Sequence, residues 1–218
     1  FYKSKLDKKS HVNIKNTGHI RFDLYRKPYR GIYQEEAEKL RRKFGPYVLI
    51  NTHFSYAINK GGLSDPSKMQ TYLEDQLLKR RKKAENKEFS SRIAEEAAEE
   101  AQKVAHFISL AKYLSSELKN LNFVFRPHPA EDFDFYKTTL QGIENIFVIN
   151  EGSVGPWIIG SEVLIHDRCT TAIEAYFAEV PVINHKIITN EKFDNRITNQ
   201  IGIKTTSNLE TKDAIEKI

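Results

Sequence analysis

Short apolar, β-rich runs alternate with helical stretches along most of this 218-residue chain. Strands are expected at residues 47–51, 123–125, 146–149, 163–165, 182–183 and 201–204. Helices are expected at residues 34–44, 133–140 and 171–178, with a long amphipathic helix from Ser90 or Ser91 to about Asn120 and a short turn around Trp157. Because strands joined by crossover helices run parallel, this alternation predicts an α/β fold, a Rossmann-like parallel sheet with flanking helices.

Basic residues are concentrated near the start of the chain. Residues 1–45 hold 13 of the 34 Lys and Arg residues but only 5 of the 29 Asp and Glu residues, and a second basic cluster lies at residues 79–83. Such clusters can bind nucleic acid or anionic lipid. A solvated helix end is the favoured interpretation of the second cluster, because no RNA- or DNA-binding motif accompanies the charges. We therefore predict a basic N-terminal or interdomain segment at residues 1–30 and a Rossmann-like domain at residues 31–218.

Arg126 and His128 directly follow one of the expected strands. Pro127 and Pro129 end that strand, because proline cannot continue a hydrogen-bond ladder, and they restrict the backbone that aims the two side chains. Arginine can bind phosphate through two parallel hydrogen bonds, and histidine can donate to phosphate or ribose. Since ligands bind at the carboxyl ends of parallel strands, we predict ligand contacts for Arg126 and His128. A strand-ending turn with a satisfied histidine is the structural alternative.

A second polar run lies between the expected strand at residues 163–165 and the helix that follows it. Thr170 and Thr171 stand at the start of that helix, where free N–H groups and two hydroxyls can form an anion site. Arg168 precedes them and is a further candidate for phosphate. Glu174 lies one turn into the helix, where its carboxylate can accept from ribose hydroxyls. The alternative is that the threonines and Glu174 only cap the helix.

Three further residues lie near the expected carboxyl ends of the strands, where a ligand cleft is predicted. His53 and Ser55 follow the strand at residues 47–51 and are candidates to face the same cleft. Cys169, the single cysteine, is expected to be a small packing residue rather than a reactive thiolate. The seven histidines lack metal-ligand spacing, and the sequence has no GxGxxG, GxxxxGK[ST] or HExxH motif. We therefore expect neither a bound metal nor a cofactor.

Several of these segments, in this order, resemble bacterial surface-carbohydrate (capsule and O-antigen) biosynthesis proteins. The resemblance covers roughly residues 15–205 and is carried by residues 17–24, 49–55, 125–131, 165–175 and 179–183. Proteins of this kind resemble glycosyltransferases of the GT-B fold. They are more distantly similar to Kdo transferases, CDP-glycerol glycerophosphotransferases and UDP-GlcNAc 2-epimerases. Relatives usually have glycine near the position of Glu179.

The resemblance implies a fold, a substrate and a set of site residues. The domain would be the nucleotide-binding half of a GT-B fold, and its substrate would be a nucleotide-sugar donor. Arg126, His128, Thr170 and Thr171 would hold nucleotide and phosphate, and Glu174 would hold ribose. The enzyme would be a metal-independent glycosyltransferase that transfers a sugar, with CMP-linked Kdo as first candidate donor, to a surface polysaccharide or lipid-linked acceptor. Its expected place is the cytoplasm, with peripheral contact at the inner face of the bacterial membrane and no nucleic-acid partner.

Other functions stay open on this sequence. A UDP-GlcNAc 2-epimerase-like enzyme would need further acid and base carboxylates in the cleft. A non-enzymatic RNA-binding or scaffold module would use the basic N-terminal segment and would bind with steep salt dependence. The acceptor-binding half of a GT-B enzyme is expected outside this chain, so the chain alone can bind donor without catalysing transfer. The sequence does not identify a catalytic base.

Overall fold

The computed structural model describes residues 18–59, 87–190, 192–194 and 197–218. Six strands form one sheet in the order β3-β2-β1-β4-β5-β6, and all neighbouring strands are parallel. The strands are β1 (Tyr47–Asn51), β2 (Asn122–Arg126), β3 (Ile146–Val148), β4 (Val163–His166), β5 (Val182–His185) and β6 (Ile203–Thr205). The predicted Rossmann-like α/β fold is confirmed, and each predicted strand is present with its ends shifted by no more than 2 residues.

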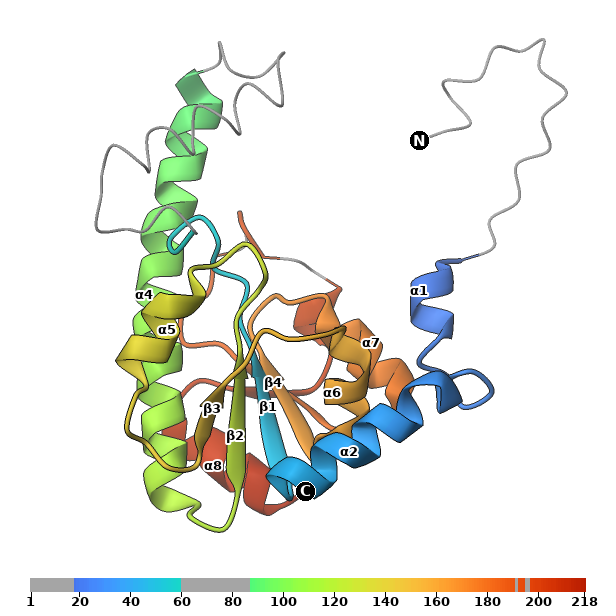
Figure 1. Ribbon diagram of the computed structural model, residues 1–218. Helices are drawn as coiled ribbons and strands as arrows, with labels where there is room; N and C mark the ends of the chain where they lie inside the picture. The colour runs from blue at the N-terminus through green and yellow to red at the C-terminus, as the bar shows by residue number, and fades with distance from the viewer. Residues whose placement is uncertain (1–17, 60–86, 191, 195–196) are drawn as a thin grey trace, which may run out of the picture.

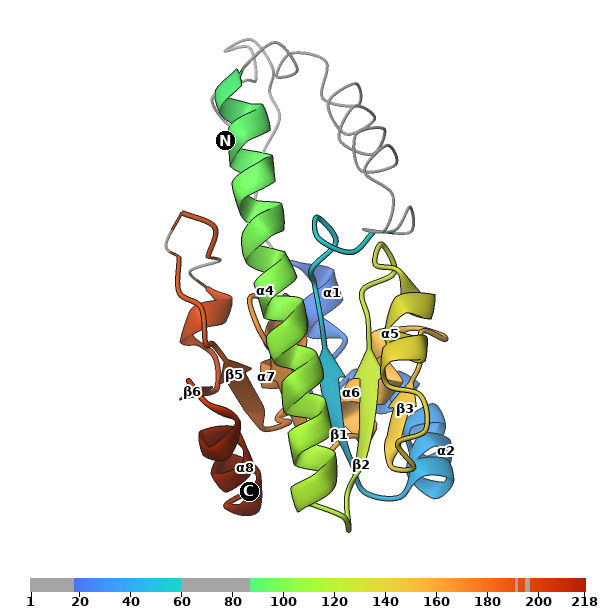
Figure 2. The same cartoon turned by 90° about the vertical axis from the view of Figure 1, so that its left-hand side faces the viewer.

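Helices cover both faces of this sheet (Figures 1 and 2). One face carries α4 (Lys87–Glu117), α5 (Phe133–Thr139) and α8 (Asn208–Glu216). The other face carries α2 (Gln34–Phe44), α6 (Val154–Gly160) and α7 (Thr171–Ala178). The short helix α1 (Ile20–Asp23) packs against α7. Two short 3₁₀ turns, η1 (Arg30–Tyr33) and η2 (Thr198–Gln200), lie in the connections. Side chains alternate along each strand. Val48 and Ile50 therefore enter the core beneath α4, and Tyr47 and Leu49 enter the core beneath α7.

Two predictions about helices were wrong, and α8 had no predicted counterpart. Trp157 lies in α6 instead of a turn. Pro156 is compatible with this helix because it stands in the first turn, where a backbone N–H has no helical partner. The long helix α4 begins at Lys87, ahead of the predicted serine cap. The Ser91 hydroxyl instead donates to Glu95 within the helix, at 3.2 Å.

Gly160 allows α6 to pack closely against β1 and α2. A Cβ at this position would meet the Tyr47 hydroxyl and, at 3.2 Å, the Ala37 carbonyl oxygen. Tyr47 is buried, and its hydroxyl donates to the Trp157 carbonyl at 2.8 Å, so it cannot easily move aside. We expect Gly160→Ala to lower the free energy of unfolding in urea by about 1–3 kcal/mol. Gly31→Ala, whose Cβ would meet nothing within 4 Å, is the control, and equal losses in both variants would contradict this explanation.

Candidate functional site

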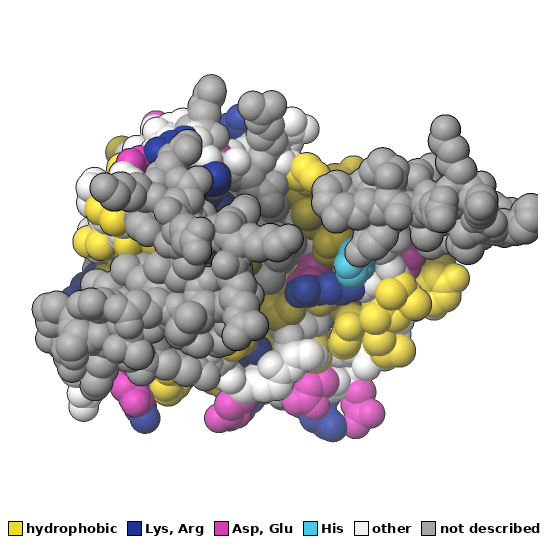
Figure 3. All heavy atoms as spheres, turned by 90° about the horizontal axis from the view of Figure 1, so that it is seen from above, with side chains coloured by type: hydrophobic (Ala, Val, Ile, Leu, Met, Phe, Trp, Pro, Cys, Tyr) yellow, Lys and Arg dark blue, Asp and Glu magenta, His cyan; other side chains and the backbone are white. Residues whose placement is uncertain are grey.

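The loops that follow β1 and β4 leave the sheet at its topological switch point. The chain adds β2 and β3 on one side of β1 and then β4, β5 and β6 on the other. In sheets of this order, ligands bind outside the carboxyl ends of the strands at the switch point. These ends point upward in Figure 1, and Figure 3 looks down on them. Figure 3 shows basic, acidic and histidine side chains side by side there, bordered by hydrophobic ones.

His53 and His128, which follow β1 and β2, lie in contact at this end. Their ring centroids are 4.6 Å apart and their planes are nearly perpendicular. The Ala130 N–H donates to His128 Nδ1 at 3.1 Å, so the proton of the neutral ring is on Nε2. Burial lowers the pKa of His128. The pKa of His53 is also lowered, by desolvation and then by His128 and Arg168, although His53 keeps part of its surface in solvent.

Glu131 joins the loop after β1 to the loop after β2. Its buried carboxylate accepts a hydrogen bond from the Thr52 hydroxyl and another from the Phe54 N–H, both at 2.6 Å. Its own N–H donates to the His128 carbonyl at 2.8 Å. Burial raises the pKa of Glu131. Glu131 therefore joins the loop that carries His53 to the loop that carries His128.

Glu100 of α4 holds the loop after β1 from the opposite side. One carboxylate oxygen accepts from the Tyr56 N–H at 2.8 Å and the Ala57 N–H at 3.3 Å. The other oxygen accepts from Arg168 Nη2 at 3.1 Å. Burial raises the pKa of Glu100 to about 8, against the opposing effect of Arg168. Ser55 lies half-buried in this loop, so the predicted His53 and Ser55 belong to a segment held by two buried glutamates.

Arg168 is engaged by protein groups. Its backbone has φ 57°, in the left-handed region. The buried guanidinium donates to the Phe193 carbonyl at 3.1 Å and forms ion pairs with Glu96 at 3.6 Å, Glu99 at 3.9 Å and Glu100. The predicted contact with phosphate would require this guanidinium to leave its partners.

Arg126 is engaged in a similar way. Its two Nη atoms donate to the Glu151 carbonyl at 2.8 Å and the Gly152 carbonyl at 2.6 Å. The guanidinium also lies over the Trp157 ring, 5.6 Å from its centroid. Arg126 therefore holds the loop between β3 and α6, and its predicted contact with a ligand remains a prediction.

The two predicted threonines at the start of α7 have different surroundings. Thr170 is the N-cap residue, it is exposed, and its hydroxyl makes no capping hydrogen bond. Thr171 is buried, and its hydroxyl donates to Cys169 Sγ at 3.1 Å. Burial raises the pKa of the Cys169 thiol, which agrees with a packing role. The exposed Thr170 hydroxyl is thus the better placed of the two to meet a ligand.

Glu174, the predicted ribose ligand, is covered by residues of the N-terminal segment. Its carboxylate forms an ion pair with Arg21 Nε, and the Tyr25 hydroxyl lies near it. Burial raises the pKa of Glu174, and these two partners oppose the shift. Arg21 and Tyr25 belong to the predicted segment 1–30, and Tyr25 is buried in the core beneath α7.

A row of buried polar side chains, which was not predicted from the sequence, lies beneath the site. Asn51, His166 and Asn184 are aligned across β1, β4 and β5, on the face that α7 covers. Each is 3% exposed or less, and burial lowers the pKa of His166 to about 4. The sequence carried a signal for this row. Each of the three polar residues stands two positions after an apolar residue, and so on the same face of a strand that is buried on both faces.

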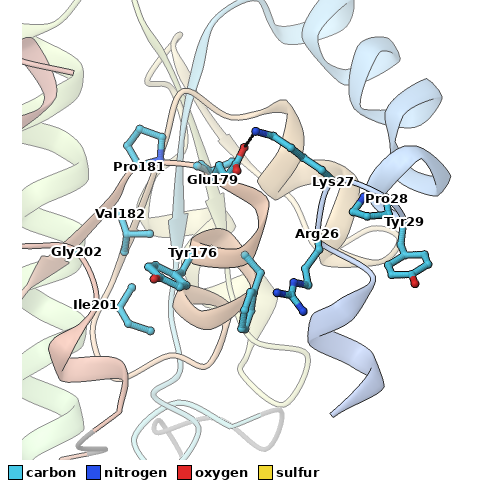
Figure 4. A pocket seen from close by; sticks show the side chains of 12 residues that line it. Arg26, Lys27, Pro28, Tyr29, Tyr176, Glu179, Pro181, Val182, Ile201 and Gly202 are labelled. Carbon is cyan, nitrogen blue, oxygen red and sulfur yellow. Dashed lines mark ion pairs between the residues drawn. The ribbon is translucent and has the colours of Figure 1, made fainter. Parts of the chain in front are cut away.

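A cavity of about 960 Å³ lies at the far end of α7 (Figure 4). Tyr176, Pro181 and other residues line it, but none of the predicted site residues does. Glu179 borders this cavity with φ 62°, in the left-handed region that favours glycine. Its carboxylate pairs with Lys27 at 3.1 Å and Arg30 at 3.5 Å.

The described residues contain neither a metal-binding cluster nor a membrane-spanning helix. No group of three or more His, Cys, Asp or Glu side chains in this part of the chain could hold a metal ion. No helix among the same residues is long and apolar enough to cross a membrane.

Comparison with known proteins gave a likeness to solved structures but no match in sequence. No protein-family model and no curated protein sequence matches the chain. A solved structure of UDP-GlcNAc 2-epimerase from Neisseria meningitidis, bound to UDP-GlcNAc, is similar with a TM-score of 0.43 and 12% sequence identity. The likeness covers 84% of this chain and 39% of that enzyme, so the chain spans about two fifths of the length of its neighbour. A likeness at this level does not transfer function from one protein to the other.

Proposed function

We propose that this chain is the donor-binding domain of a nucleotide-sugar enzyme, of the GT-B glycosyltransferase type. The observation that carries the proposal is the contact between His53 and a neutral His128 at the switch point, with the exposed Thr170 at the neighbouring strand end. His128 Nε2 and the Thr170 hydroxyl are hydrogen-bond donors suited to phosphate oxygens. Donors held in place by the fold would stabilise the negative charge that develops on the departing nucleotide.

The resemblance to surface-carbohydrate enzymes supports the finer parts of the proposal. It favours a CMP-linked 2-keto sugar such as Kdo as donor, with UDP- or CDP-linked groups next. The acceptor would be a surface polysaccharide or a lipid-linked glycan, bound by a part of the enzyme outside this chain, near the inner face of the membrane. Epimerisation of a nucleotide-sugar has less support, because Glu100 and Glu131 are buried and their carboxylates hold backbone N–H groups.

Nucleotide binding tests this proposal. Calorimetry and thermal shift with CMP, CDP, UDP and GMP, without metal, should show one preferred nucleotide. We expect His128→Ala to weaken its binding about tenfold, the effect of losing one hydrogen bond to a charged acceptor. His106→Ala, at a half-buried position on α4, is the matched control and should bind like the wild type.

The pH dependence provides a second readout. Because the pKa of His128 is lowered, its ring is neutral at pH 7 and donates through Nε2. Affinity for the preferred nucleotide should therefore change little between about pH 7 and pH 8.5, whereas a site that depended on imidazolium would lose affinity as that proton left. Equal binding by wild type and His128→Ala, or no binding of any nucleotide by the wild type, would contradict the donor-site assignment.

A further inference from the structure

The short helix α1 is fixed against α7 by contacts of its apolar side. The Phe22 ring stacks on Phe177 with centroids 6.2 Å apart. Tyr25, directly after the helix, is 3% exposed and lies in the core beneath α7. His19 caps the helix by accepting from the Arg21 N–H at 3.3 Å. Arg21 therefore projects from backbone that the fold holds in place.

Among the described residues, Arg21 contacts a partner through only one edge of its guanidinium. Nε forms the ion pair with Glu174, whose side chain is 0% exposed, whereas the Arg21 side chain is 53% exposed. A planar guanidinium has five N–H donors arranged as a fork. With Nε directed at Glu174, the edge formed by the two Nη atoms remains for a bidentate contact with an anion.

The position of Glu174 places this guanidinium near the start of α7. Glu174 lies four residues after Thr170, so the two side chains lie on the same face of the helix, one turn apart. Helical side chains also tilt toward the N-terminus, which directs Glu174 and its partner toward the end where the Thr170 hydroxyl is exposed. Figure 1 shows α1 beside this end of α7, at the level of the carboxyl ends of the strands.

Among the described residues, the other arginines near the site do not offer a comparable group. Arg168 and Arg126 are each 8% exposed or less, and their guanidinium groups hold carboxylates or backbone carbonyls. Arg21 combines an exposed fork with a buried carboxylate that orients it. An arginine oriented in this way loses little conformational freedom when it binds phosphate.

We propose that Arg21 is a phosphate-binding residue of the donor site and that Glu174 is its positioning residue. Glu174 then acts through Arg21 and does not bind the ribose. This inference rests on the proposed function, because it names the cationic group that receives the donor's phosphate next to Thr170 and His128.

Titration with inorganic pyrophosphate, a probe without ribose or base, tests Arg21 directly. We expect Arg21→Ala to weaken binding between about tenfold and about 100-fold, as removal of a charge-assisted contact does. Arg42→Ala removes the same charge from an exposed position on α2 and should leave binding unchanged. Arg21→Lys keeps the positive charge beside Glu174 but lacks the fork. It should keep the melting temperature of the wild type and still lose most of the affinity, which separates binding from folding.

Glu174→Gln separates the positioning role from ribose binding. We expect this variant to bind pyrophosphate several-fold more weakly and to keep the wild-type preference for the ribonucleotide over its 2′-deoxy counterpart. Loss of that preference with unchanged pyrophosphate binding would show that Glu174 binds ribose and would overturn the inference. So would pyrophosphate binding by Arg21→Ala at wild-type affinity. If His128→Ala weakens binding and Arg21→Ala does not, only this inference fails; if wild type binds neither pyrophosphate nor any nucleotide, the proposed function fails as well.

Discussion

Replacement of Lys103 by methionine is expected to lower the free energy of unfolding by about 3–5 kcal/mol at neutral pH. Lys103 lies inside the domain, 2% exposed, and its ammonium pairs with Glu99 at 2.8 Å and Asp167 at 2.9 Å. Methionine fills a similar volume without a charge. The variant therefore leaves two buried carboxylates without their nearest cation, which is the costly way to break a buried ion pair.

The loss in Lys103→Met should depend on pH. Burial raises the pKa of Asp167, and Lys103 opposes that shift, so removing Lys103 raises this pKa further. A carboxyl group whose pKa is higher in the folded than in the unfolded state destabilises the fold most above the folded pKa. This penalty shrinks as pH falls below the folded pKa and is gone below the unfolded pKa. The difference between wild type and variant in urea denaturation should therefore be smaller at pH 5 than at pH 7.5.

Lys112→Met provides the control for this experiment. Lys112 stands on the exposed side of α4, the helix that also carries Lys103. Its replacement should therefore change the free energy of unfolding by less than about 0.5 kcal/mol. A loss in Lys103→Met that is no larger than in Lys112→Met, or that is the same at both pH values, would contradict the assignment of Lys103 to a buried ionic network.

Replacement of Glu131 by alanine should have the second-largest effect, a loss of about 3 kcal/mol in the free energy of unfolding. The variant removes the acceptor of two short hydrogen bonds and leaves the Thr52 hydroxyl and the Phe54 N–H buried without it. Nucleotide binding should weaken too, because His53 and His128 would no longer be held in contact. Urea denaturation measures the first effect, and calorimetry on the folded variant measures the second.

Asp132→Ala is the matched control, since it removes a carboxylate from the next position. The Asp132 side chain caps α5 by accepting from the Asp134 N–H at 3.0 Å and the Phe135 N–H at 3.2 Å. Loss of such a cap costs about 1 kcal/mol, and nucleotide binding should stay intact. If Glu131→Ala costs no more than Asp132→Ala, or binds nucleotide like the wild type, then Glu131 does not join the two loops as the structure indicates.

Local patterns were sufficient to predict most of the elements. The strands are short runs of β-branched and aromatic residues, and α2 and α7 have the predicted ends. These features depend on hydrophobic spacing and on residues that stop an element, and both are readable from neighbours in the sequence. Because parallel strands align their carboxyl ends, the same patterns also placed His53, His128 and Thr170 at one edge of the sheet.

The roles of the charged residues depended on contacts between segments that are distant in sequence. Arg168 meets Glu100 of α4, and Arg21 meets Glu174 of α7. Glu100 carries a sequence signal, since it stands seven residues after the buried Ile93 on the apolar stripe of α4. A charge on that stripe predicts a buried partner but does not identify it.

The sequence was thus enough to predict the sheet, most of its flanking helices and the edge where a ligand can bind. Only the tertiary structure showed which polar groups at that edge hold the protein together and which remain exposed to a ligand. The physical reason is burial. A charge removed from water must find a partner, and the partner that it finds depends on how the chain folds back on itself.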